Sequence, residues 1–273
     1  MATPDNILLV IAHPDDEALV SGTICLCAEK GCSITLVCVT DGEAGDSQGL
    51  PVNSHLTLGE IRQQEVKLAA SALGVSEVRF LHRPDVADPE NDDAWNQSDL
   101  ILALAQIIQE ATPALILTHG PRGGYGSPAH QLVYRCVMAA AGNVSYAGSV
   151  FSFCGKVRGA FFSWHFDQPS DVLIDVRGFL NRRAASLWYH QSQIGFFLRP
   201  YFPRTPRKLA SAAFGYAFML FESGRRRVPI ATSSRFFRRY PTEGLAHHRL
   251  PGEVRPHFFQ ERFHDDLRVR NIG

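Results

Sequence analysis

The chain has 273 residues, of which 45% are hydrophobic and 20% are charged, and its formal net charge is zero. These values are typical of a soluble globular protein with one large domain, or one domain and a lid. No uninterrupted apolar run is long enough to span a bilayer, and no basic segment precedes the first apolar run. We therefore expect neither a transmembrane segment nor a signal peptide.

The cysteines predict a reduced, cytoplasmic protein. None belongs to a Cys-x-x-Cys pair with a matching second pair, so the sequence does not predict a structural zinc site. Most have apolar neighbours, which is typical of small buried side chains. The six are Cys25, Cys27, Cys32, Cys38, Cys136 and Cys154.

Strand and helix patterns alternate through the first half of the chain. Residues 6–12 predict a buried strand, residues 17–30 a helix, and residues 33–39 a strand rich in β-branched side chains. The alternation continues with helices predicted at 58–73, 100–110 and 128–141, and with strands at 78–81 and 114–118. Such repetition predicts the α/β class, with a mostly parallel sheet covered by helices on both faces. No Gly-x-Gly-x-x-Gly follows the first strand, so a dinucleotide site is not predicted.

The pattern changes in the second half. Residues 157–164 and 172–176 predict strands, and residues 178–194 predict a helix. The composition shifts after these elements, so we divide the chain into a main domain, residues 1–198, and an extension, residues 199–273.

The extension is basic and rich in aromatic residues, with 15 lysine and arginine residues against 6 acidic ones. Its charge indicates an anionic partner, such as a phosphate-bearing substrate, or docking on the acidic remainder of the chain. Residues 209–221 predict an apolar helix that is too short to span a membrane. This helix can make a peripheral membrane contact, act as a lid or form a subunit interface, and the extension can equally complete the core. Nothing in the sequence indicates a nucleic-acid partner, and the oligomeric state stays open.

The most informative stretch, residues 11–17, follows the first strand and reads Ile-Ala-His-Pro-Asp-Asp-Glu. Ligands bind at the carboxyl edge of an open α/β sheet. Pro14 keeps His13 out of the α region, so His13 and Asp16 can hold one metal ion while Asp15 points at the metal's remaining ligand. The alternative is that Asp15 or Asp16 caps the helix that follows.

His130 is the natural third metal ligand, because it lies in the first turn of a helix that follows a glycine-rich loop. Two imidazoles and one carboxylate leave a coordination position open for water, as in catalytic zinc sites. Zinc lowers the pKa of such a water to about 7, and Asp15 would take its proton as general base. The sequence therefore predicts a zinc-dependent attack on a carbonyl, although another divalent metal can bind the same ligands.

Two further loops follow strand ends and should lie near His13. The first contains Asp41 and Glu43, and the second contains Asp85. These carboxylates can bind sugar hydroxyls, or they can be ordinary turn and cap residues.

The chain resembles the LmbE-like, or PIG-L, family of zinc-dependent N-deacetylases. The motifs that carry the resemblance lie in the family's order over roughly residues 6–195 of this sequence. They are His13-Pro14-Asp15-Asp16-Glu17, Asp41-Gly42-Glu43, Arg62-x-x-Glu65 before Leu73-Gly74, Gly124-Tyr125-Gly126 before His130, and His190-x-Ser192-Gln193.

The resemblance implies a Rossmann-like fold and removal of acetyl groups from N-acetylglucosaminyl conjugates. The conjugate would be a small molecule, and the group joined to its sugar can be amphiphilic or anionic. The resemblance also implies that His13, Asp16 and His130 are the zinc ligands and Asp15 the base. Four residues are then predicted to bind substrate: Glu43, Arg62, Asp85 and His190.

The sequence departs from the family at the end of the glycine-rich loop. The family usually has His-Pro-Asp-His there, whereas this chain has Ser127-Pro128-Ala129-His130. The missing first histidine normally stabilises the oxyanion or protonates the leaving amine, and loss of an oxyanion donor costs about 10²–10³ in turnover. We expect Ser127 and Tyr125 to donate hydrogen bonds, with His165 or His190 replacing the missing imidazole. The alternatives are an amidase for a larger acyl or peptide-like bond, and a non-catalytic metal or sugar binder.

Overall fold

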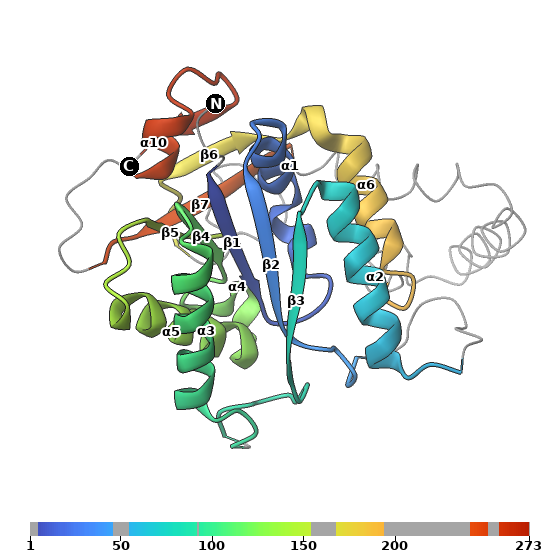
Figure 1. The fold of residues 1–273 in the computed structure, drawn as a ribbon. Coiled ribbons are helices and arrows are strands. Elements are labelled where there is room, and N and C mark those ends of the chain that lie inside the picture. The colour runs from blue at the N-terminus through green and yellow to red at the C-terminus, as the bar shows by residue number, and fades with distance from the viewer. Residues whose placement is uncertain are drawn as a thin grey trace, which may run out of the picture.

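The computed structural model describes residues 5–45, 55–91, 93–153, 168–193, 241–250 and 257–272. Within these ranges eight strands form one sheet in the order β3-β2-β1-β4-β5-β7-β6-β8 (Figure 1). The strands are β1 (Asn6–Ile11), β2 (Ser33–Thr40), β3 (Glu77–Arg83), β4 (Leu115–Thr118), β5 (Ser149–Ser152), β6 (Val172–Asp175), β7 (Thr242–His248) and β8 (Val269–Asn271). Strands β1 to β5 are parallel to one another, whereas β7 is antiparallel to β5 and β6, and β8 is antiparallel to β6. The predicted α/β class is confirmed.

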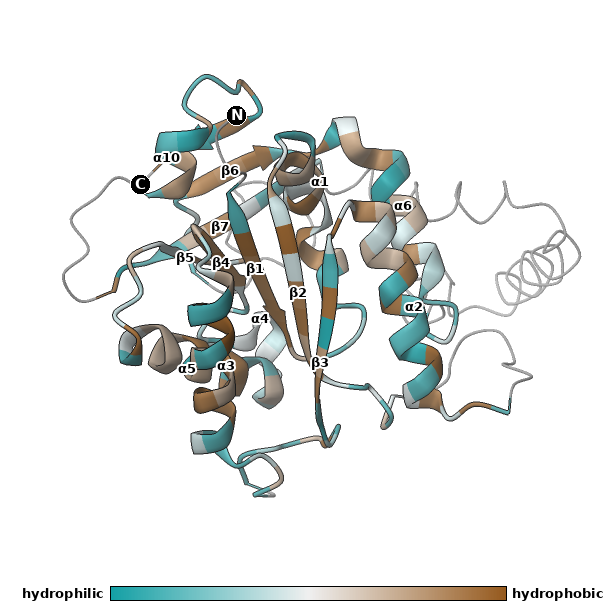
Figure 2. Ribbon diagram, viewed as in Figure 1, coloured by the Kyte–Doolittle hydropathy of each residue, from teal (hydrophilic) through white to brown (hydrophobic). Residues whose placement is uncertain are grey.

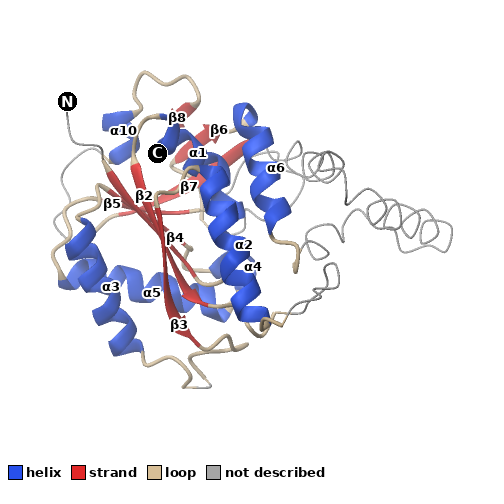
Figure 3. Ribbon diagram, turned by 45° about the vertical axis from the view of Figure 1, so that its right-hand side comes forward, coloured by secondary structure: helices blue, strands red, loops and turns tan. Residues whose placement is uncertain are grey.

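Helices lie on both faces of the sheet (Figure 3). Helices α1 and α2 pack on one face with α6 beside α2, and α3 and α5 cover the other face. The helices are α1 (Ser21–Glu29), α2 (Leu58–Leu73), α3 (Gln97–Ala111), α4 (Gly123–Gly126), α5 (Pro128–Asn143), α6 (Leu180–Tyr189) and α10 (Phe258–Arg262), with 3-10 turns η1 (Asp16–Val20) and η2 (Arg177–Phe179). In these described parts, no helix has the length and apolarity needed to span a membrane.

The central strands are apolar on both sides, which explains the uninterrupted hydrophobic run at the start of the chain (Figure 2). Ile7, Leu9 and Ile11 of β1 belong to the core on the α1 and α2 face. Leu8 and Val10 belong to the core on the α3 and α5 face. Alternating side chains of one strand thus enter two cores, as expected for a parallel strand buried on both sides.

Local sequence signals set the bounds of α2. Thr57 and Glu60 form a capping box at its start, and Gly74 adopts φ +86° just after its end. The helix predicted at 17–30 instead divides into η1 and α1. The start of α1 is set by a distant residue, because Glu243 of β7 accepts the N–H groups of Gly22 and Thr23.

The described parts of residues 199–273 contribute to the sheet. Strand β7 lies between β5 and β6, and β8 forms the edge beside β6. The strand predicted at 157–164 and the helix predicted at 209–221 fall outside the described residues, so the lid remains a prediction.

Candidate metal centre

The candidate site lies at the carboxyl edge of the sheet, where the chain order reverses. The loops after β1 and β4 leave this edge from neighbouring strands, and α5 begins just after the second loop. Such a switch point is where open α/β sheets bind ligands. The loops after β2 and β3 reach the same edge, because these strands are parallel to β1.

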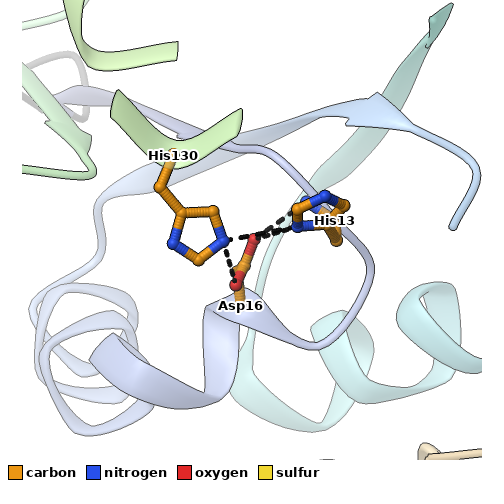
Figure 4. Close-up of side chains that lie close together, drawn as sticks. All are labelled: His13, Asp16 and His130. Carbon is orange, nitrogen blue, oxygen red and sulfur yellow. Dashed lines mark hydrogen bonds and ion pairs between the residues drawn. The ribbon is translucent and has the colours of Figure 1, made fainter. Parts of the chain in front are cut away.

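Three side chains converge on one point between these loops (Figure 4). His130 Nε2 lies 3.3 Å from His13 Nδ1 and 3.2 Å from Asp16 Oδ1. His13 Nδ1 lies 3.5 Å from Asp16 Oδ2. His130 and Asp16 are buried, and His13 is partly buried. One ligand atom from each residue lies within 4.8 Å of the others, which is the arrangement that a single cation can bridge.

The tautomer of His130 fits a metal ligand. Its Nδ1 lies 3.2 Å from the carbonyl oxygen of Gly123, which can only accept a hydrogen bond. Nδ1 therefore carries a proton, and Nε2 is the ring nitrogen that faces the Asp16 carboxylate and can bind a metal. Two lone-pair atoms this close require a cation or a proton between them, so the residues fit a divalent metal.

The charges around the cluster follow from burial and close carboxylates. Burial lowers the pKa of His13, but Asp16 and Asp85 more than offset this and raise it to about 10. Burial raises the pKa of Asp16, whereas the neighbouring imidazoles, His130 first among them, hold it well below its usual range. The Asp16 carboxylate is thus ionised at neutral pH, as a metal ligand must be.

His119 belongs to the site, although no role was predicted for it from the sequence. It follows β4, is 2% exposed, and stacks on His130 with ring centroids 3.8 Å apart. Its Nε2 accepts the N–H of Ala12, and burial together with His130 lowers its pKa to about 4. His119 is therefore a neutral ring that supports His130. Its position directly after a predicted strand is the sequence feature that could have identified it as a site residue.

Asp15 lies beside the cluster and is oriented by Arg62. Arg62 Nη2 lies 3.2 Å from Asp15 Oδ2, and the same guanidinium donates to the carbonyl oxygens of Pro14 and Gly42. Burial raises the pKa of Asp15 to about 6, although Arg62 lowers it. Neither predicted cap is present, because no side chain caps η1 and Asp16 accepts the N–H of His13 instead.

Asp85 and Glu43 connect the loops after β3 and β2. Asp85 Oδ1 lies 3.4 Å from His13 Nε2, on the opposite side of the ring from Asp16. Glu43 Oε1 accepts the N–H of Asp85 at 2.8 Å, and Asp85 Oδ2 accepts the N–H of Ala44. A carboxylate on the far nitrogen of a histidine ligand orients that ring.

Asp41 lies directly after β2 and pairs with an exposed histidine. Its carboxylate lies 2.8 Å from Nδ1 of His82.

Tyr125 lies in α4, and Ser127 follows at the start of α5. Ser127 is the N-cap of this helix, and its Oγ accepts the N–H of His130 at 3.4 Å. Tyr125 is 56% exposed and meets the His130 ring edge-on at 5.2 Å. Ala129, in place of the family's aspartate, is 2% exposed in the core beneath the helix. His165 lies outside the described residues.

His190 was predicted to bind substrate, but it is buried. It is 0% exposed, and its Nε2 pairs with Oε1 of Glu17, which is also 0% exposed. Glu17 belongs to the motif at residues 13–17, but nothing in the sequence connects it with a residue 173 positions away.

Solved structures with related folds have different activities. The N,N'-diacetylchitobiose deacetylase from Pyrococcus horikoshii matches with a TM-score of 0.58 at 17% identity, over 90% of this chain and 84% of that chain. GalB, the 4-carboxy-2-hydroxymuconate hydratase from Pseudomonas putida, matches with a TM-score of 0.56 at 19% identity, over 92% of this chain and 100% of that chain. At such identities the similarity establishes the fold alone.

Sequence comparison identifies the family. The family model described as PIG-L, GlcNAc-PI de-N-acetylase, matches residues 8–141. A 1D-myo-inositol 2-acetamido-2-deoxy-α-D-glucopyranoside deacetylase 2 from Catenulispora acidiphila is 37% identical over 164 residues, 53% of this chain and 54% of that protein. The match thus spans about half the length of that relative. A deacetylase of the same substrate from Acidothermus cellulolyticus is 30% identical over 264 residues, 80% of this chain and 89% of that protein. The chain therefore belongs to the PIG-L, or LmbE-like, family of de-N-acetylases.

Proposed function

We propose that this chain is a metal-dependent hydrolase that removes the N-acetyl group from an N-acetylglucosaminyl conjugate. The observation that carries the proposal is the convergence of His13, Asp16 and His130 with Asp15 fixed beside them by Arg62. A metal site alone would need no free carboxylate at its edge, whereas hydrolysis needs a base there. We also propose a cytoplasmic location, which the cysteine pattern predicts.

His13, Asp16 and His130 would hold the metal. A divalent ion bound there supplies a Lewis acid that polarises the amide carbonyl. Zinc suits two imidazoles and one carboxylate with an open position, although other divalent ions bind the same donors.

Asp15 acts as the general base in this proposal. Its Oδ2 is oriented by Arg62 Nη2, so the carboxylate is held in one direction while it takes a proton from the attacking water. Asp85 acts on His13 by bonding the ring nitrogen that faces away from Asp16.

Ser127, Tyr125 and His165 are proposed to assist the carbonyl oxygen and the leaving amine. The Oγ of Ser127 accepts the N–H of His130, so its hydroxyl proton can still be donated. Tyr125 lies exposed against His130, where a phenol can donate to an oxyanion.

The substrate is proposed from the relatives' names and from the polar rim. Two relatives act on a 2-acetamido-glucopyranoside of 1D-myo-inositol, so this conjugate is our first candidate. Glu43 and Asp85 supply carboxylates that suit sugar hydroxyls. Arg62 is 4% exposed and already donates to Pro14, Gly42 and Asp15, so we propose that it acts on the base and not on the sugar. A basic extension would accommodate an anionic or amphiphilic partner group on the sugar.

The test is acetate release by the zinc-loaded protein from N-acetylglucosamine, its inositol conjugate, and lipid- and peptide-linked conjugates. We expect release from at least one conjugate, with Asp15→Asn about 10²–10⁴ slower because the base is lost. Asp175→Asn, in a surface ion pair with Arg177, is the matched control and should keep full activity.

Other outcomes of the same panel would contradict the proposal. Cleavage of long-chain acyl groups only would indicate an amidase. Zinc binding with no turnover on any conjugate would indicate a binding protein, with Ser127 and Ala129 as the reason. Full activity of Asp15→Asn would remove Asp15 as the base.

A further inference from the structure

Asp15 holds a backbone conformation that aspartate disfavours. Its φ is +105° and its ψ is −16°. A non-glycine residue in such a region costs about 1–3 kcal/mol and persists only where its surroundings fix it. A hydrogen bond to a nearby residue holds this conformation. The N–H of Asp15 donates to Oε2 of Glu17 at 3.1 Å.

Glu17 is itself held by a residue from the other half of the domain. Its second carboxylate oxygen, Oε1, pairs with Nε2 of His190, and both side chains are 0% exposed. A buried carboxylate needs such a partner, because burial of an unpaired charge is costly. Burial lowers the pKa of His190, but Glu17 more than offsets this and raises it.

His190 reaches Glu17 because of the way α6 ends. It is the C-cap residue of α6, and its N–H donates to the carbonyl oxygen of Leu187 at 3.2 Å. Its own carbonyl oxygen accepts the N–H of Gln193 at 3.0 Å. These bonds fix the backbone of His190, and its full burial leaves no surface for the substrate contact predicted from the sequence.

We propose that Glu17 and His190 are a positioning pair that aims the Asp15 carboxylate at the metal centre. His190 orients Glu17, and Glu17 holds the N–H of Asp15 in the left-handed conformation. The inference rests on the proposed function, because it assumes that Asp15 is the base. Neither Glu17 nor His190 touches the reacting atoms, so both act through Asp15.

A matched control pair lies on the same segment. Ser192 follows His190 by two residues and bonds Glu65 of α2 through its N–H at 2.7 Å and its hydroxyl at 2.6 Å. Both residues are buried. This pair also connects the end of α6 to α2, but within the described part of the chain neither residue bonds to Asp15.

The experiment compares His190→Leu, His190→Gln and Ser192→Ala. Leucine removes the partner of Glu17, whereas the glutamine Nε2 can still donate to it. We expect His190→Leu to lower kcat about 10²-fold with KM and zinc stoichiometry unchanged, because a displaced catalytic group costs about that much. His190→Gln should restore most of kcat. Ser192→Ala should lower stability alone.

Crystal structures of the variants give a readout that does not depend on activity. In His190→Leu we expect the φ of Asp15 to leave the left-handed region, and in Ser192→Ala we expect it to stay at its present value. An unchanged Asp15 backbone in His190→Leu, or an equal loss of kcat in Ser192→Ala, would overturn the inference. If the unaltered protein has no activity on any conjugate, the proposed function fails, and the Asp15 backbone in His190→Leu still decides whether the pair positions it.

Discussion

Gly42 lies where the loop after β2 passes beneath the guanidinium of Arg62. Its φ is +73°, and an added Cβ would lie 2.4 Å from Nη1 of Arg62. Its carbonyl oxygen also accepts from that same Nη1. The glycine therefore serves two purposes, because it permits a left-handed backbone and leaves room for the residue that orients Asp15.

Gly42→Ala should lower both stability and activity, whereas Gly31→Ala should lower stability alone. Gly31 has φ +83° with nothing within 4 Å of an added Cβ, so it measures backbone strain, about 1–2 kcal/mol, by itself. Gly42→Ala adds the displacement of Arg62, which should reduce kcat for acetate release. Urea denaturation and the acetate assay would measure the two effects. Equal stability and equal activity in the two variants would show that Arg62 is not displaced.

At this scale the sequence predicted which residue types gather at the site but not what each one contacts. His13, Asp16 and His130 were expected to converge because a parallel sheet brings its loops to one edge, and the structure places them together. His119 and Glu17 were not assigned roles. Their partners depend on tertiary packing, which leaves no fixed spacing along the chain.

Elements with strong local signals were predicted well, whereas three strands that are defined by pairing with distant segments were not. The predicted helix at 58–73 coincides with α2, because Thr57 and Gly74 mark its two ends in the sequence itself. The strands at 33–39 and 114–118 also agree within a residue or two with β2 and β4. Strands β5, β7 and β8 were not predicted, because β5 pairs with β7 and β8 pairs with β6 across long stretches of the chain.

Thr57→Ala should lower the free energy of unfolding by about 1 kcal/mol, because it removes the hydroxyl that caps α2. That hydroxyl accepts the N–H of Glu60 at 3.3 Å, and the Glu60 carboxylate accepts the N–H of Thr57 at 2.8 Å. Thr57→Ser keeps the hydroxyl and should lose only a few tenths. Urea denaturation of the two variants would test this, and an equal loss in both would contradict a capping role.

A buried ion pair connects elements that are far apart in the sequence. Glu243 of β7 lies 3.2 Å from Nη2 of Arg183 in α6, and both side chains are at most 4% exposed. The same carboxylate accepts from Thr23, at its N–H and at its hydroxyl, at the start of α1. One residue near the end of the chain thus fixes elements from its beginning and its middle.

Glu243→Gln should destabilise the protein by about 3–5 kcal/mol, because it removes the carboxylate that pairs with the buried guanidinium of Arg183. Glu77→Gln is the matched control, since Glu77 pairs with Arg79 at the surface and such pairs contribute about 1 kcal/mol or less. Guanidinium denaturation of both variants would measure the difference. Similar losses in the two would contradict the structural role assigned to Glu243.

The place of β7 in the sheet has a consequence for how the protein is made. Val150 of β5 pairs with His248 of β7, 98 positions later in the chain. Until that strand leaves the ribosome, β5 presents an open row of N–H and C=O groups, the kind of edge that joins other chains. Among the described strands, β6 pairs only with β7 and β8. Counting the described strands alone, a nascent chain that stops before residue 242 would hold five parallel strands with β5 at an open edge, and β6 would lack both of its partners.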